Sequence, residues 1–234
     1  MESDSPAIQS AQIREAIFRG FDREKMILYL RNNIGFPASQ GFIPIGLPGQ
    51  IHEETKIWNP PRARELVNAY IKDTGIQPSL RLATDANYLD MCQYIQRELE
   101  KIGIRIQIDL MPTASLRQAK TSGKLELFRA SWIADYPDAE NYLGLFYSKN
   151  FSPNGPNYTH YSNAQYDQWF EESYLIKNPK KRAKHYRQMN RLMLSEYPVI
   201  PLYYDQAIRF AQKNVKGLSM NPINILQLKT VKKE

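Results

Sequence analysis

Apolar residues recur at helical spacing over the first part of the chain. Helices are predicted over residues 10–19 and 23–30, where apolar side chains return to one face every three or four positions. A further helix is predicted from Asn59, because an Asn followed by two prolines is typical of a helix start, and Gly75 is expected to end it. Between these helices, repeated Pro and Gly over 35–49 predict a loop that crosses the surface.

The middle of the chain alternates strands with helices. A short strand over 80–84 precedes an amphipathic helix over 87–101, and strict alternation over 104–110 predicts a second, half-buried strand. Thr113 is expected to cap another helix, after which Leu125 opens a third strand that is predicted to be central and buried. The order β-α-β-α-β indicates an α/β fold in which the strands are parallel and the crossovers right-handed.

The remainder of the chain is predicted to be mainly helical, with extended segments towards its end. Asp138 is placed to cap the first of these helices, because Asp is a favoured N-cap residue. The predicted elements are helices over 139–146, 162–177 and 179–196, a turn-rich surface loop over 148–161, a turn at 215–217, and extended chain over 198–204, 207–211 and 223–231.

Composition narrows the class of protein without identifying it. The 234 residues carry 31 Lys and Arg against 24 Asp and Glu, a net charge of +7, and 15 tyrosines suited to adaptable contact surfaces. Much of the positive excess lies in two runs, over 177–191 and from Lys229 to the end. Because the first run spreads around the outside of a predicted helix, it is interpreted as a solvated face, and nucleic-acid binding is not expected.

The usual signatures of enzymes and metal sites are missing from the sequence. Cys92 is the one cysteine, the three histidines are scattered, and the chain has no G-x-S-x-G, H-E-x-x-H or Gly-rich phosphate motif. Neither catalysis nor a metal or cofactor is therefore expected. No apolar run approaches the roughly 18 residues of a membrane span. The polar N-terminus also lacks the apolar region of a signal peptide, as expected of a segment of a longer protein.

One stretch, over 125–138, concentrates chemistry at the end of a predicted strand. Arg129, Trp132 and Asp135 lie within seven residues there. Ligands of open α/β sheets bind at the carboxyl ends of strands, so these side chains are candidates for a binding site. The pattern is equally compatible with a core tryptophan followed by loop and capping carboxylates.

Several segments in order resemble the family 5 bacterial extracellular solute-binding proteins, which include the dipeptide- and oligopeptide-binding components of ABC transporters. The helix pair that ends in D-R-E-K is the first match, and Gly20 is a departure where the family commonly has Ala. The matching segments are 13–25, 37–44, 59–75, 96–106, 161–167 and 200–204.

The resemblance implies a lobe of the type II periplasmic-binding-protein kind, with a mostly parallel or mixed sheet flanked by helices. Residues 1–200 would form the C-terminal ligand-binding lobe, and 201–234 would form the hinge crossing and the segment that returns to an absent N-terminal lobe. Half a cleft is expected to bind ligand weakly or undetectably. The resemblance further implies permease subunits of an ABC transporter as partners, and a periplasmic or extracellular location with the signal or lipid anchor outside this chain.

The resemblance also assigns roles along an unbroken match from Arg129 to Tyr136. Asp135 would pair with the α-ammonium group of a peptide, and Arg129 would face a peptide carboxylate with Lys120 as a less directional second cation. Backbone groups near Ser131 would bond the peptide like an added strand. The full set of implied ligand-binding residues is Lys120, Arg129, Ser131, Trp132 as a pocket wall, Ile133, Asp135 and Tyr136. The alternative is a non-catalytic protein-interaction module that uses Tyr-rich loops such as 157–161.

Overall fold

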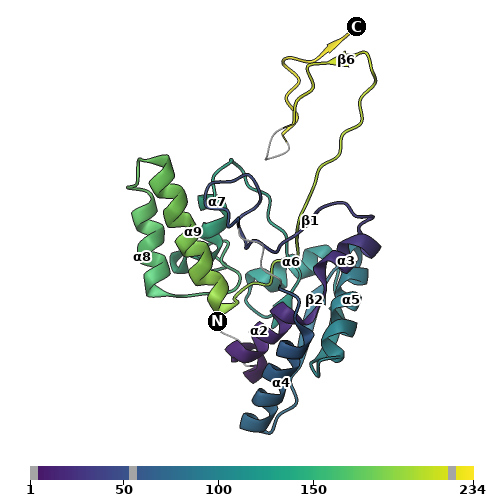
Figure 1. Ribbon diagram of the computed structural model, residues 1–234, viewed down its shortest axis with the longest axis vertical. Coiled ribbons are helices and arrows are strands. Elements are labelled where there is room, and N and C mark those ends of the chain that lie inside the picture. Colours follow the sequence, from purple (N-terminus) through teal and green to yellow (C-terminus); the bar gives the residue numbers. More distant parts are fainter. Residues whose placement is uncertain (1–4, 53–56, 221–224) are drawn as a thin grey trace.

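Three parallel strands organise the computed structural model, which describes residues 5–52, 57–220 and 225–234 (Figure 1). They are β2 (Ser79–Thr84), β3 (Arg105–Leu110) and β4 (Leu127–Phe128), in the order β3-β2-β4. β2 pairs with β3 along its whole length, from Ser79↔Arg105 to Thr84↔Leu110. The connections run through α5 (Leu89–Glu100) and α6 (Thr113–Thr121). The predicted β-α-β-α-β order and the parallel pairing are therefore confirmed.

A first hydrophobic core surrounds β2 and β3. Helices α1 (Pro6–Gln9), α2 (Ala11–Gly20), α3 (Arg23–Leu30) and α4 (Pro60–Thr74) pack there together with α5. α1 precedes the first predicted helix, whereas the inward faces of α2, α3, α4 and α5 follow the predicted helical spacing. Asp22 accepts hydrogen bonds from the first turn of α3, Asn59 caps α4, and Gly75 ends α4 in the left-handed conformation that glycine tolerates. The short 3-10 turn η1 (Ala86–Tyr88) precedes α5.

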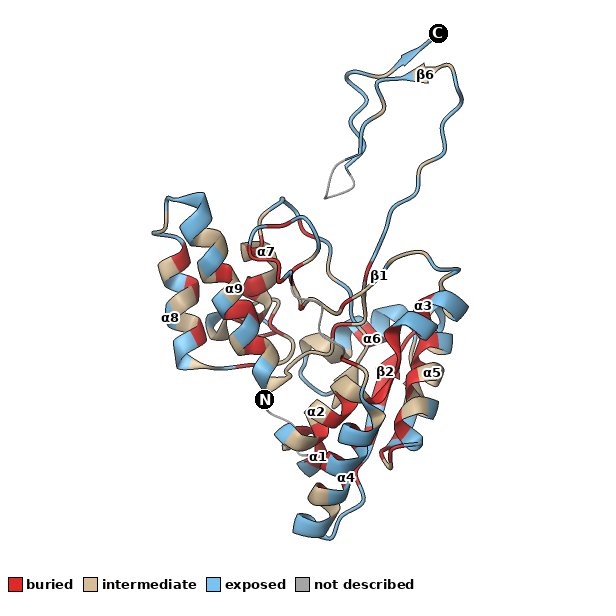
Figure 2. Cartoon of the chain, viewed as in Figure 1, coloured by how far each residue is buried: buried red, intermediate tan, exposed pale blue. Residues whose placement is uncertain are grey.

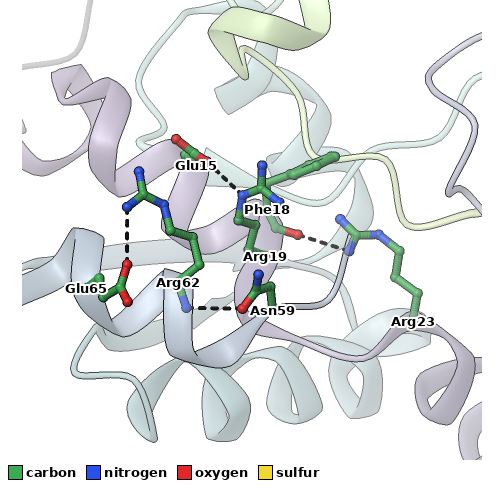
Figure 3. Close-up of polar contacts among 7 residues, drawn as sticks. All are labelled: Glu15, Phe18, Arg19, Arg23, Asn59, Arg62 and Glu65. Atoms are coloured by element: carbon green, nitrogen blue, oxygen red, sulfur yellow. Dashed lines mark hydrogen bonds and ion pairs between the residues drawn. The ribbon is translucent and has the colours of Figure 1, made fainter. Parts of the chain in front are cut away.

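A buried arginine, Arg23, connects this core to a distant part of the chain, and Figure 3 shows its hydrogen bond to the Phe18 carbonyl. Arg23 is 4% exposed, and its Nε donates to the Pro201 carbonyl at 2.7 Å while Nη1 donates to the Phe18 carbonyl at 3.0 Å. The guanidinium also lies over the Phe21 ring, 4.5 Å from the centroid. Nearby, Arg62 pairs with Glu65 at the surface. Arg23 thus joins the α2–α3 corner to residues that lie after all of the helices.

A second core lies between the helices of the later half. It is built by α7 (Glu140–Leu143), η2 (Gly144–Phe146), η3 (Ser148–Asn150), α8 (Ala164–Ser173) and α9 (Pro179–Glu196). Figure 2 shows buried residues along the facing sides of α8 and α9. The largest fully buried side chains there are Phe146, Tyr166 and Tyr186. Since two clusters pack separately, the predicted lobe over 1–200 contains two hydrophobic cores. No helix among the described residues is long and apolar enough to cross a membrane.

Two predicted surface loops contribute to the second core instead. In the 35–49 loop Ile43 is fully buried, and Phe42 N donates to the Asn190 side chain of α9. In the 148–161 loop Asn157 and Tyr161 are buried, because the Asn157 amide donates to two backbone carbonyls and closes the loop on itself. Apart from strand β1 (Phe36–Pro37) and the turn η3, proline and glycine indicated irregular chain correctly, but irregular chain does not require exposure.

The third strand differs most from its prediction. β4 spans Leu127–Phe128, is only partly buried and lies at an edge, with β2 in the centre. The reason is that β2 ends at Thr84, and the next residue, Asp85, caps η1. The residues beyond Arg129 therefore have no part of β2 with which to pair. The prediction of a central, buried strand through residue 131 was therefore wrong.

Smaller corrections concern helix ends. Thr113 is the first residue of α6 and follows the N-cap position at Pro112, so it is not the cap. The predicted helix over 139–146 divides into α7 and the 3-10 turn η2, because the side chains of Tyr166 and Asn150 donate to the Leu143 and Gly144 carbonyls. The helix expected to reach residue 177 ends at Ser173.

The last thirty residues leave the body of the molecule (Figure 1). β1 (Phe36–Pro37) and β5 (Tyr203–Tyr204) pair antiparallel at the exit point. Beyond it, β6 (Val215–Lys216) pairs with β7 (Lys232–Lys233), and residues 207–211 form no strand because no neighbouring strand lies beside them. The predicted turn at 215–217 is in part strand β6. The predicted extended segment over 223–231 begins outside the described residues and holds no strand before β7.

Candidate functional site

The carboxyl ends of β2 and β4 bring Asp85 and Arg129 to the same edge of the sheet. Arg129 N donates to the Ala83 carbonyl at 3.0 Å, which places its side chain just beyond the last pair of the ladder. The Arg129 guanidinium stacks on the Tyr88 ring, 3.0 Å from the centroid, and its Nη1 lies 3.4 Å from Ser131 Oγ. Stacking on an aromatic face leaves the donors around the rim of the guanidinium available to an anion.

Lys120 lies near Arg129 at this edge. The pKa of Lys120 is lowered, first by partial burial and then by the positive charges of Arg129 and Arg117, while Asp85 acts in the opposite direction. Its Nζ also lies 5.7 Å from the centroid of the Tyr158 ring. Two cations that disfavour each other's charge would both be stabilised by an incoming carboxylate.

After Arg129 the chain runs without a backbone partner. Within the described part of the chain, the N–H and C=O groups of residues 130–133 form no hydrogen bond. Ser131 and Ile133 are exposed, and the Ile133 side chain is 77% accessible. An extended backbone with free donors and acceptors can pair with another extended chain, as an edge strand does.

Alternate residues of this segment point to opposite sides. Trp132 Nε1 donates to Asn141 Oδ1 at 2.7 Å, Ala134 is buried, and the Tyr136 hydroxyl donates to the Glu140 carboxylate. Asp135, by contrast, is exposed and forms no hydrogen bond or ion pair with another described residue. The structure therefore places Trp132 and Tyr136 against α7, and leaves an unpaired carboxylate between them.

Asp138 has a structural role. One of its oxygens accepts from Glu140 N at 2.9 Å and the other pairs with Arg182 of α9 at 3.3 Å. The Asp138 side chain thus bonds the first residue of α7 as a capping residue does, although the N-cap position itself is Ala139. These partners distinguish Asp138 from the unpaired Asp135. Sequence reasoning missed Tyr88, Asn141 and Glu140, which support the segment from outside the matched motif. The one available signal was the position of Glu140 and Asn141 at a predicted helix start.

Other chemistry is not assembled at this edge. No group of three His, Cys, Asp or Glu side chains that could hold a metal ion occurs in the described ranges. Cys92 is buried, and burial raises the pKa of its thiol. In the Tyr-rich loop over 157–161, Asn157 and Tyr161 are buried and residues 158–160 are half-buried. The loop that suggested the interaction-module alternative is therefore accessible only in part.

Comparison with known families identifies the class of protein to which this chain belongs. The sequence model of the bacterial extracellular solute-binding proteins, family 5 middle, matches residues 1–154. The chain belongs to this family.

Relatives of this family 5 chain bind peptides according to their names. It is 23% identical to the dipeptide-binding protein DppE of Bacillus subtilis over 94% of its own length and 42% of that protein. It is 25% identical to the glutathione-binding protein GsiB of Shigella flexneri over 90% of its length and 43% of that protein. The chain thus spans less than half the length of these curated relatives.

A solved structure confirms the fold. The periplasmic binding protein DppA of Helicobacter pylori, in complex with the peptide STSA, superposes with a TM-score of 0.85 at 18% identity, over 98% of this chain and 45% of that one. The helix-flanked, parallel-sheet lobe of a type II periplasmic binding protein is therefore the architecture of this family 5 chain.

Proposed function

We propose that this chain forms one wall of a peptide-binding cleft in a solute-binding protein that serves import by an ABC transporter. Residues 1–200 act as the ligand-binding lobe, and residues 201–234 cross the hinge and return to a second lobe. Permease subunits of the transporter are the partners, and the protein works in the periplasm or on the outer face of the cell membrane. The role is binding and release of a ligand without catalysis.

The observation that carries the proposal is the exposed, unpaired carboxylate of Asp135 beside free backbone groups at 130–133. A charged side chain without a partner suits the α-ammonium group of a peptide, and free N–H and C=O groups suit its backbone. At the other end of the segment, Arg129 and Lys120 suit a carboxylate. Recognition of termini and backbone binds peptides without selecting their side chains.

Binding by this chain is expected to be weak, because the cleft has a single wall. We therefore expect tri-alanine to bind with a dissociation constant in the millimolar range, near −4 kcal/mol. Micromolar affinity would show that a single lobe suffices and would contradict this part of the proposal.

Nuclear magnetic resonance on the 234-residue chain tests the assignment. Tri-alanine should shift the backbone amide signals of residues 129–136, and N-acetyl-tri-alanine, which lacks the ammonium group, should shift them much less. Asp135→Ala should weaken the response about 10- to 100-fold, as expected for a lost charge-assisted hydrogen bond. Asp73→Ala, at an exposed carboxylate on α4, is the matched control and should respond like the wild type. An unchanged response in Asp135→Ala would refute the assignment.

A further inference from the structure

The first turn of α7 touches every second residue of the ligand-facing segment. Asn141 Oδ1 accepts from Trp132 Nε1 at 2.7 Å, and Glu140 accepts from the Tyr136 hydroxyl. Between them, Ala134 is buried, and its backbone lies close enough to the Tyr142 phenol to oppose the rise that burial causes in the pKa of that phenol. Three consecutive residues of one turn therefore hold three alternate positions of the segment.

These contacts decide which side chains face outward. Successive side chains of an extended chain point to opposite sides, so fixing one set of alternate positions fixes the other. With Trp132, Ala134 and Tyr136 held against α7, the positions at 131, 133 and 135 face away from it. A shift of the segment by one residue would turn Trp132 outward and Asp135 inward.

The turn itself is firmly anchored. Ala139 and Leu143, on either side of it, are fully buried in the second core. Glu140 also accepts from the hydroxyl of Tyr174, the residue that follows α8, at 2.7 Å, and Asp138 joins the start of the turn to Arg182 of α9. Movement of the turn would disrupt contacts to two other helices, so it can act as a rigid support.

We propose that Glu140, Asn141 and Tyr142 are positioning residues that set the register of the segment and thereby present Asp135 to the ligand. The inference rests on the proposed peptide-binding function. It adds a set of residues outside the cleft that act on the ligand only through residues 132, 134 and 136.

Asn141 offers the sharpest test, because Asn141→Leu removes the acceptor at similar volume and Asn141→Asp retains it. In the 234-residue chain, nitrogen-15 relaxation of the Trp132 indole and of the 131–135 amides should show increased motion in Asn141→Leu and wild-type order in Asn141→Asp. Asn163→Ala removes the N-cap of α8, which accepts from Gln165 N and Tyr166 N. It controls for general destabilisation of the second core and should leave the segment ordered.

Tri-alanine titration of the same variants completes the test. Asn141→Leu should reduce the peptide-induced shifts at 131–135 about fivefold at a fixed peptide concentration, as expected for one lost hydrogen bond, and Asn141→Asp should restore them. If the 131–135 segment of Asn141→Leu were as ordered as that of the wild type, the inference would be overturned. It would also be overturned if the segment became mobile while the peptide-induced shifts stayed the same. If the wild-type chain shows no peptide response at 129–136, the proposed function fails; the relaxation data then tell whether α7 orders the segment for the fold alone.

Discussion

At the scale of single residues, burial decides what a charge does in this protein. Arg23 and Arg62 both lie near the first core, yet the first is buried and the second is at the surface. Burial lowers the pKa of the Arg23 guanidinium to about 9, while Asp22 opposes the change. The group stays charged at neutral pH, and its carbonyl acceptors and aromatic neighbours offset the loss of water.

Arg23→Met is therefore expected to be strongly destabilising. It leaves the buried carbonyls of Pro201 and Phe18 without their donors, and the free energy of unfolding should fall by about 2–4 kcal/mol. Arg62→Met removes a surface ion pair of 3.2 Å and should change the free energy by less than ~0.5 kcal/mol. Urea denaturation of both variants provides the measurement, and equal losses would show that burial is not the deciding factor.

At the scale of elements, the second core is rich in tyrosine, and this makes it sensitive to alkali. Tyr166 of α8 is fully buried, its hydroxyl donates to the Leu143 carbonyl at 2.8 Å, and burial raises the pKa of the phenol well above its usual value. In the unfolded chain a tyrosine titrates near pH ~10. Since the folded state holds this proton more tightly, the stability it contributes is complete below pH ~10 and is lost as the pH rises further.

Tyr166→Phe should separate the contribution of the hydroxyl's hydrogen bond from the effect of its titration. Near pH 8 it should cost about 1 kcal/mol, because the Leu143 carbonyl loses its donor. Above pH ~10 its free energy of unfolding should fall less steeply than that of the wild type, by about 1.4 kcal/mol per pH unit. Denaturation at a series of pH values measures both, with Tyr29→Phe, at a 70% exposed side chain, as the control. Parallel pH profiles for Tyr166→Phe and the wild type would count against this account.

The sequence predicted helices and caps well, because their signals are local. Asp22, Asn59 and Gly75 act through neighbours within one turn, and α9 has its predicted bounds of 179–196. The length of a strand and the burial of a loop depend instead on residues that are far away in the sequence. β4 is short because β2 ends at Thr84. Ile43 is buried because Asn190 of α9 accepts a hydrogen bond from Phe42 N and holds the 35–49 loop against the second core. The candidate site shows the same division: Asp135 and Arg129 belong to a recognisable motif, but their support by Asn141 and Tyr88 becomes visible only in three dimensions.

At the scale of the whole molecule, the exposed arm after β5 stands apart from the two cores. Its strands pair only with each other, and Phe210 is 94% exposed. Such accessible apolar side chains are typical of a surface that another structure covers. This agrees with the proposed return of the arm to a second lobe.

Removal of residues 207–234 is expected to leave the free energy of unfolding within about 0.5 kcal/mol of the wild type. Truncation after Val199 should cost more than about 3 kcal/mol, because it also removes the Pro201 carbonyl and Tyr204, whose hydroxyl donates to the Gly41 carbonyl at 2.8 Å. Thermal and urea denaturation of both truncations measure the difference. A large loss in the shorter deletion would show that the arm is part of the folded body.

The pairing of Phe36 with Tyr204 has a consequence for how the protein is made. Nearly all of the first core comes from residues 7–106, so it can assemble on the ribosome while the second is still being synthesised. Phe36 and Arg23, however, must wait for Tyr204 and Pro201, the last residues of the body to emerge. Until then the loop after α3 lacks its strand partner, and its unpaired backbone groups are exposed to neighbouring chains. The pairing of these two segments completes the folded body. Before it forms, newly made molecules are most exposed to incorrect association and to binding by chaperones.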